Sequence, residues 1–159
     1  MALTAAQQAA VKADILANPD LNAFPDTADG AWAIADLYNL AADPAFVVWR
    51  SSVPTSDVME ALDWTEMVAA SVGERDTFRM MIADGNIDAT NANVRSGLQD
   101  IFSGPGGAQS RANLTAIAKR NASVVEQLFA TGDGTDGSPA TMTFEGNISY
   151  QDVLAARNS

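Results

Sequence analysis

The residues of this 159-residue chain that could do chemistry are mainly carboxylates, and several of them lie close together in sequence. Three such pairs are Asp57 with Glu60, Glu74 with Asp76, and Asp84 with Asp88. Glycoside hydrolysis needs two carboxyl groups that flank the scissile bond in a cleft, one of them with a raised pKa. Nothing in the linear spacing indicates a cleft, and charges spaced in this way are typical of a solvated helix surface. We therefore interpret these pairs as surface charges.

The chain contains no cysteine and no histidine. This composition excludes disulfides, thiolate metal sites and cysteine nucleophiles. It also excludes histidine triads and removes the commonest general base and zinc ligand. The only candidate base partners for a serine are Lys12 and Lys119. We predict that the protein is not an enzyme and has no catalytic, cofactor-binding or metal-binding residues.

Two glycine-rich segments have some likeness to ligand-binding loops. The segment Asp133–Gly137 resembles the start of a calcium loop, but a bidentate Glu is needed at the twelfth position, where this chain has Phe144. Gly104–Gly107 precedes a predicted helix, but it lacks the Lys and Ser or Thr that complete a phosphate-binding loop. We interpret the first segment as a polar linker and the second as a helix–helix turn.

The charge balance is strongly acidic. Nine Lys and Arg against twenty Asp and Glu give a net charge of −11. A phosphate backbone would repel such a chain, so we expect no direct nucleic-acid binding. The same negative charge would suit a surface along which DNA slides without binding. An ordinary acidic protein surface with no such role explains the charge equally well. The sequence shows no signal peptide and no apolar run of membrane-spanning length, so we expect synthesis in the cytoplasm and no membrane partner.

The elements that carry these residues are predicted to be short helices. Thr4 and Gln7 form a capping box at the first helix, and Asn18-Pro19 ends it. Apolar residues then recur at helical spacing in five further segments. The six helices are expected from Thr4 to Asn18, Asp26 to Asp43, Thr55 to Val68 with a bend, Glu74 to Ala83, Asn91 to Phe102, and Ala108 to Ala130 in two parts. The run 46–50 is predicted as a short strand or an extended connection.

The character of the sequence changes after Gly132. Residues 133–139 are rich in Asp, Gly, Ser and Pro and predict a flexible linker. Thr141–Phe144 and Ile148–Tyr150 predict two strands of a hairpin, and Ser149 caps a last helical segment from Gln151 to Arg157. We therefore predict a mainly α fold, with a helical bundle over 1–132 and a hairpin-like extension over 133–159.

Four segments resemble a family of structural proteins encoded in the virion modules of tailed bacteriophages and prophages. They are Leu3–Gln7 leading to Asn18–Asp20, Ala45–Val53, Phe102–Gly107 with Arg111, and Glu126–Gly132 continuing through Ser138–Ala140 and Phe144–Gly146 to Asp152-Val153. Together they span nearly the whole chain, while residues from about 56 to 92 are not matched. The resemblance implies a structural part of the phage particle and carries no catalytic residues.

Within that class, the layout favours a head-to-tail adaptor (connector), which forms a homo-oligomeric ring under the portal. A helical body followed by a linker and an unpaired hairpin fits docking by strand addition to a portal or tail protein. We expect the apolar residues of the extension to make this contact: Met142, Phe144, Ile148 and Tyr150. The expected location is the virion, and DNA would pass through the ring. The alternatives are a capsid-decorating or tail-completion protein and, in a different class, an acidic cytoplasmic inhibitor that mimics DNA.

Overall fold

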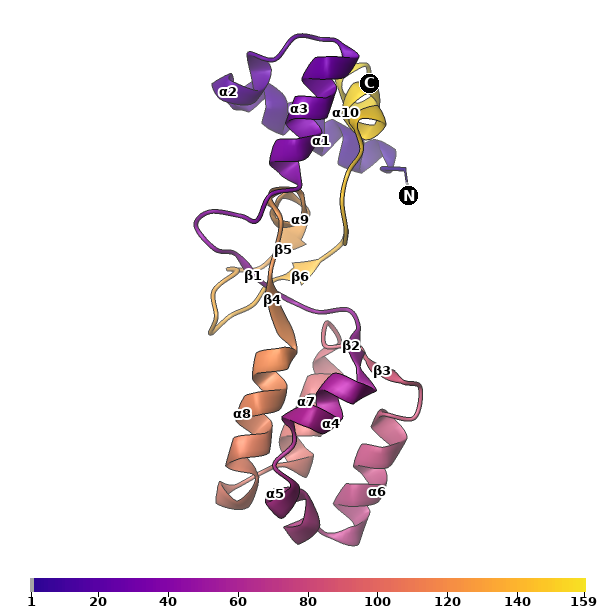
Figure 1. Cartoon of the computed structure of the whole chain (residues 1–159), viewed down its shortest axis with the longest axis vertical. Coiled ribbons are helices and arrows are strands. Elements are labelled where there is room, and N and C mark those ends of the chain that lie inside the picture. The colour runs from indigo at the N-terminus through magenta and orange to yellow at the C-terminus, as the bar shows by residue number, and fades with distance from the viewer. Residues whose placement is uncertain (1) are drawn as a thin grey trace. The chain divides into compact units, whose positions relative to one another are not determined.

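The computed structural model describes residues 2–159. The chain is mainly helical, as predicted, and these residues form ten α-helices with short two-stranded sheets (Figure 1). They divide into two compact units: unit 1 comprises the chain up to Val48 and from Asn121 to Ser159, and unit 2 comprises Trp49–Arg120. Strands β1 (Val47–Trp49) and β4 (Lys119–Asn121) pair with each other and contain the two points at which the chain passes between the units.

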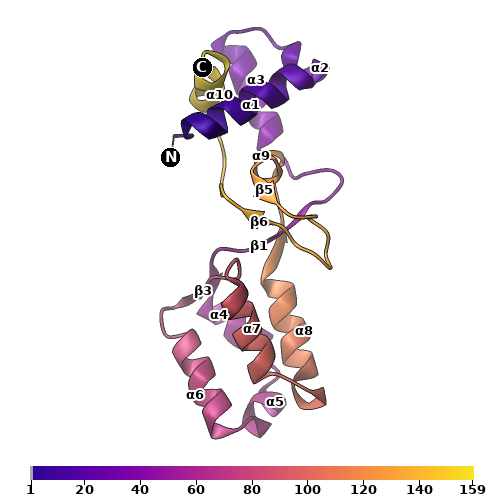
Figure 2. The same ribbon diagram turned by 180° about the vertical axis from the view of Figure 1, so that it is seen from behind.

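Unit 1 is built on three helices from the two ends of the chain. Helix α10 lies beside α1 and α3, as both ribbon views show (Figures 1 and 2). Buried side chains such as Ile15, Ile34 and Val153 fill the space between them. The elements of unit 1 are α1 (Ala5–Ala17), α2 (Pro19–Asn22), α3 (Ala28–Tyr38), α9 (Val124–Leu128), β5 (Ala130–Thr131), β6 (Thr141–Met142) and α10 (Tyr150–Arg157).

Capping residues determine where the helices of unit 1 begin. The predicted capping box of Thr4 and Gln7 is confirmed at α1, and Ser149 caps α10 together with Asp152. An oxygen side chain at each N-cap accepts a backbone N–H that has no partner inside the helix, which stabilises the helix start by about 1 kcal/mol. The short helix α2, capped by Asn18, was not predicted, because Pro19 marks the start of a helix as well as the end of one.

Unit 2 is a bundle of short helices around a second apolar core. Phe78 and Phe102 meet edge to face in it, with ring centroids 5.7 Å apart. The expected bend in the third predicted helix is a break, because Asp63 caps a new helix there. The elements of unit 2 are β2 (Val53–Pro54), α4 (Thr55–Ala61), α5 (Trp64–Ala69), α6 (Val72–Met81), β3 (Asn86–Ile87), α7 (Ala92–Ile101), the 3₁₀ turn η1 (Pro105–Gly107) and α8 (Ala108–Ile117).

The predicted helix from Ala108 to Ala130 is also interrupted. Strand β4 separates α8 from α9, and Ser123 starts α9 with a capping box that includes Glu126. The backbone N–H of Ala122 bonds to the carbonyl of Phe46 at 2.8 Å, so the chain is extended at this point. Alanine's helix propensity is outweighed here by a tertiary hydrogen bond and by a new cap.

The C-terminal part of the chain differs most from the prediction. The hairpin consists of β5 and β6, with Ala130 opposite Met142 and Thr131 opposite Thr141, instead of two strands within 141–150. Its loop includes the predicted linker, and the N–H of Val47 holds this loop by a 2.7 Å bond to the carbonyl of Gly134. The predicted boundary at Gly132 is therefore not a boundary between units: residues 133–159 belong to unit 1, because their apolar side chains complete its core.

None of the helices in residues 2–159 is long and apolar enough to cross a bilayer.

Candidate interaction surfaces

Two of the four residues expected to contact a partner are buried in unit 1. Phe144 packs edge to face on Phe129 with centroids 5.4 Å apart, and Ile148 lies in the same core. The amide of Asn39 fixes Ile148 on both sides, since it donates to the carbonyl of Ile148 at 2.9 Å and accepts its N–H at 3.0 Å. This placement corrects the expectation that both side chains face another molecule: the apolar pattern was that of a core segment.

The other two residues lie closer to solvent. Met142 is half-buried and packs against the small cluster of Val48, Ala122 and Ala140 in unit 1. Tyr150, at the start of α10, is half-buried and stacks on Trp32 of α3, with ring centroids 4.5 Å apart and an interplanar angle of 19°. Tyr150 thus connects the predicted set to Trp32, an exposed aromatic residue.

The carboxylates singled out in the sequence have local structural roles. Asp57 lies 3.6 Å from a guanidinium nitrogen of Arg50. Glu74 accepts the N–H of Ser71 at 2.7 Å and so closes the N-terminus of α6, and Asp88 accepts the N–H of Thr90 at 2.9 Å. Within residues 2–159, no group of three or more acidic side chains is arranged to hold a metal ion.

Each unit exposes its own set of large apolar side chains. Such side chains, when they gather on a surface, mark sites of protein–protein contact. In unit 1 the set comprises Leu16, Trp32, Leu37 and Leu40, and in unit 2 it comprises Trp64, Val68, Val72 and Met80. Trp32 and Trp64 are equally exposed, at 52%. Sequence reasoning missed both, because a tryptophan at helical spacing is more often part of a core.

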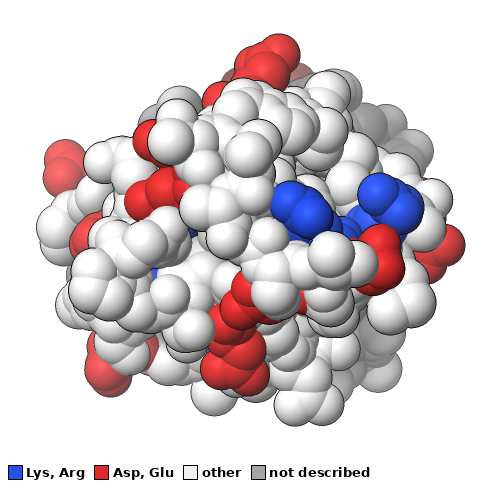
Figure 3. All heavy atoms as spheres, turned by 90° about the horizontal axis from the view of Figure 1, so that it is seen from below, with Lys and Arg blue, Asp and Glu red and all other residues white. Residues whose placement is uncertain are grey.

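Three exposed members of the unit 2 set lie on α5 and at the start of α6, and we call this group the α5–α6 stripe: Trp64, Val68 and Val72. Trp64 and Val68 lie one turn apart on α5, on the same side of the helix. The guanidinium of Arg75 donates to the carbonyl of Val68 at 3.0 Å, which holds the first turn of α6 against the end of α5. Figure 3 shows unit 2 from the side of α5, and uncharged atoms cover most of that face, with acidic and basic side chains interspersed.

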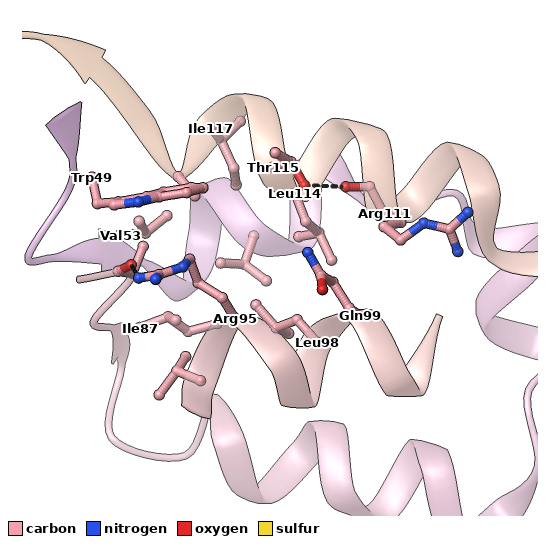
Figure 4. Close-up of a pocket in the computed structure, with 14 residues that line it drawn as sticks. Trp49, Val53, Ile87, Arg95, Leu98, Gln99, Arg111, Leu114, Thr115 and Ile117 are labelled. Carbon is pink, nitrogen blue, oxygen red and sulfur yellow. Dashed lines mark hydrogen bonds between the residues drawn. The ribbon is translucent and has the colours of Figure 1, made fainter. Parts of the chain in front are cut away.

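A pocket in unit 2 lies between α7, α8 and the segment that begins at Trp49 (Figure 4). Its walls are mainly apolar, and the guanidinium of Arg95 lies 4.5 Å from the centroid of the Trp49 ring. Arg95 also donates to the carbonyls of Ala89 and Thr90, at 2.6 and 2.8 Å. The pocket has room for only a few water molecules, which is typical of a packing gap in a core and too little for a ligand site.

Comparison of the chain with protein-family models, curated protein sequences and solved structures gives no match.

Proposed function

We propose that this chain is a structural protein of a tailed bacteriophage particle and acts as a head-to-tail adaptor, a non-enzymatic protein that joins other proteins. The observation that supports this proposal best is that each of the two units exposes its own apolar set with a half-exposed tryptophan. An exposed apolar set in each unit would give one small chain the two contacts that a protein needs to link neighbours in an assembly. The phage context comes from the sequence segments described above.

The proposed contact differs from docking through a C-terminal arm. Residues 141–159 contribute Phe144, Ile148, Val153 and Ala156 to the unit 1 core. Their removal would unfold unit 1, so a truncated chain cannot separate docking from folding. The exposed apolar sets are therefore the proposed docking surfaces, and single surface substitutions are the appropriate test.

The first experiment measures assembly. The chain is purified, and its mass distribution is recorded by mass photometry alone and with the portal protein of the phage that encodes it; negative-stain images show whether rings form. The adaptor proposal predicts a ring in at least one of these samples, because a connector must match the symmetry of the portal. A strict monomer in both samples would contradict it.

The second experiment concerns the α5–α6 stripe. We expect Val68→Ser to reduce ring formation or portal binding, because Val68 is 72% exposed and contributes little to folding. Ala69→Ser is the matched control, since Ala69 is an exposed residue of the same helix that is neither three nor four positions from Trp64 or Val68. Equal assembly by both variants would remove the stripe from the proposed interface.

The position in the particle separates the adaptor from its structural alternatives. Gold labelling of a tagged chain at the head–tail junction supports the adaptor. Labelling over the capsid surface identifies a decorating protein, and labelling along or at the end of the tail identifies a tail-completion protein.

One observation favours the alternative of a different class, an acidic inhibitor that mimics DNA. Unit 1 holds eleven of the twenty Asp and Glu and two of the nine Lys and Arg, which gives it a net charge of −9. A DNA mimic would bind a basic host protein, and that complex would weaken steeply with added salt. Recovery of such a complex from infected cells, with no chain in purified particles, would replace the adaptor proposal.

A further inference from the structure

The outward side of α3 combines an aromatic ring with two carboxylates. Asp29, Trp32 and Asp36 are spaced three and four residues apart, so they lie along one side of the helix. All three are exposed, whereas Ile34 and Tyr38 on the opposite side are buried in the unit 1 core. The indole of Trp32 therefore lies between two negative charges at the surface.

The indole is held in a fixed orientation. Tyr150 stacks on it at 4.5 Å and 19°, so one face of the ring is covered by another aromatic ring. Tyr150 in turn is the first residue of α10, which Ser149 caps and which Val153 and Ala156 attach to the core. Trp32 is still 52% exposed, so the stacking leaves about half of the side chain accessible to a ligand.

The charge around this platform is negative. The two basic residues of unit 1 bond to other groups: the Lys12 ammonium donates to the carbonyl of Ser159, and Arg157 donates to the carbonyls of Phe24 and Pro25, at 2.8 and 2.9 Å. Arg157 also lies 3.9 Å from Asp26. A cation that approaches Trp32 would thus meet Asp29 and Asp36 in a unit of net charge −9.

A half-exposed indole flanked by carboxylates is suited to a guanidinium or an ammonium group. The negative face of the ring attracts the cation, and the carboxylates pair with its N–H groups. The same chain shows this kind of contact in unit 2, where Arg95 lies over Trp49. Trp32 has the ring and the charges for such a contact.

We propose that the Asp29–Trp32–Asp36 face of α3 binds an Arg or Lys side chain from a basic segment of a partner protein. The proposal rests on the proposed function, since it specifies the chemistry of one of the adaptor's partners. A partner is favoured over a second copy because Arg50, Arg95 and Arg111 donate to backbone carbonyls of their own unit, and Arg79 pairs with Asp76 at 3.2 Å.

The test uses a fluorescently labelled hexa-arginine peptide as the probe and measures its affinity for the full chain by anisotropy. We expect saturable binding that Trp32→Ala weakens by about fivefold, the effect of one exposed cation–π contact. Gln99→Ala is the control, since Gln99 is an exposed residue that lies outside unit 1 and outside both apolar sets. Equal affinity of the two variants, or no binding, would overturn the proposal.

A second comparison separates local recognition from general attraction to an acidic protein. Asp29→Asn with Asp36→Asn should weaken binding more than Asp20→Asn with Asp133→Asn, which removes the same charge from exposed positions elsewhere in unit 1. In ¹H–¹⁵N spectra, the indole N–H of Trp32 should shift on binding more than those of Trp49 and Trp64. Equal losses by both double variants, or equal shifts of all three indoles, would show attraction without a site and would overturn the proposal.

The failure of this inference and that of the proposed function give different results. If Trp32→Ala assembles into rings as the unchanged chain does and binds hexa-arginine equally well, the inference is wrong while the adaptor role stands. If the chain forms no ring with the portal but loses hexa-arginine affinity on Trp32→Ala, the cation-binding face is supported and the adaptor role is not.

Discussion

The carboxylate of Glu126 accepts the backbone N–H of Gly146 at 2.9 Å, and so links α9 to the segment that leads into α10. The other carboxylate oxygen accepts the N–H of Ser123 at the start of α9, also at 2.9 Å. Glu126 is 4% exposed, which is unusual for a charged residue unless its oxygens are well bonded. Through these two bonds, Glu126 attaches the segment before α10 to the start of α9 within unit 1.

Replacing Glu126 with Ala should therefore destabilise unit 1. The change leaves the N–H groups of Ser123 and Gly146 without their partner and removes two charge-assisted hydrogen bonds, at a cost of about 2–4 kcal/mol in the free energy of unfolding. Urea denaturation followed by circular dichroism measures this loss. Glu74→Ala is the matched control, because Glu74 occupies the same capping-box position at α6 but is not buried in a core. If both variants lose the same stability, the bond to Gly146 contributes nothing.

The segment predicted as a flexible linker should be sensitive to a single methyl group. A Cβ at Gly134 would lie 2.1 Å from the ring of Phe46, and the residue has a φ of +66°, which favours glycine. We expect Gly134→Ala to destabilise unit 1 by about 1–3 kcal/mol. Gly137→Ala, three residues further on, should have little effect, because nothing lies within 4 Å of its Cβ. Equal stability of the two variants would mean that the loop does not pack on Phe46.

The helices were predictable from sequence because their signals are local. The Thr4 and Ser149 caps are confirmed in the structure, and the apolar residues of α7 follow the helical repeat that the sequence predicts. These signals depend on residues three or four positions apart, so they need no knowledge of the fold.

The arrangement of the C-terminal segment depended on distant residues. Phe144 and Ile148 alternate with polar residues as in a strand, and the pattern does not reveal that Phe129 and Asn39 surround them. The role of Glu126 had a partial signal, since Ser123 lies three residues before it as in a capping box; its bond to Gly146 had none. The exposure of Trp32 likewise depends on which side of α3 packs on α1 and α10, and sequence periodicity alone does not determine that for an alanine-rich helix.

Glu66 should make the stability of unit 2 depend on pH in the acidic range. Its pKa is lowered, mainly because the backbone N–H of Ser110 donates to its carboxylate at 2.7 Å, with a further bond from the N–H of Gln109 at 3.0 Å. A carboxyl group with a lowered pKa in the folded state stabilises that state above its unfolded pKa of about 4.3, and the effect is lost as the pH falls through the folded value.

Thermal melts of the unchanged chain and of Glu66→Gln between pH 7 and pH 3 measure this effect. We expect the unchanged chain to be the more stable at pH 7, and the difference to shrink as the pH falls below about 4. A constant difference across the range would show that the charge of Glu66 does not contribute.

Tyr38 should produce the opposite trend, in the alkaline range. It is buried in the unit 1 core, and its hydroxyl donates to a carboxylate oxygen of Asp14 at 2.7 Å. Burial, followed by this hydrogen bond and the negative charge of Asp14, raises the pKa of Tyr38 far above its ordinary value. The unfolded chain loses this proton near pH 10 while the folded chain retains it, so the stability that the group contributes is present below pH ~10 and falls as the pH rises further.

Tyr38→Phe tests this relationship at two pH values. At pH 7 we expect it to lower the free energy of unfolding by about 1 kcal/mol, the net contribution of one hydrogen bond, because Asp14 loses its donor. Between pH 10 and 11 the difference in the free energy of unfolding should shrink. In the unchanged chain the unfolded state is stabilised by release of the Tyr38 proton, and Tyr38→Phe has no such proton. Phenolate absorbance supplies the control: the difference between the unchanged chain and Tyr38→Phe reports Tyr38, and it should show no ionisation at pH 11 until the chain unfolds. A phenolate signal from folded Tyr38 near pH 10 would mean that the hydroxyl is neither buried nor bonded to Asp14.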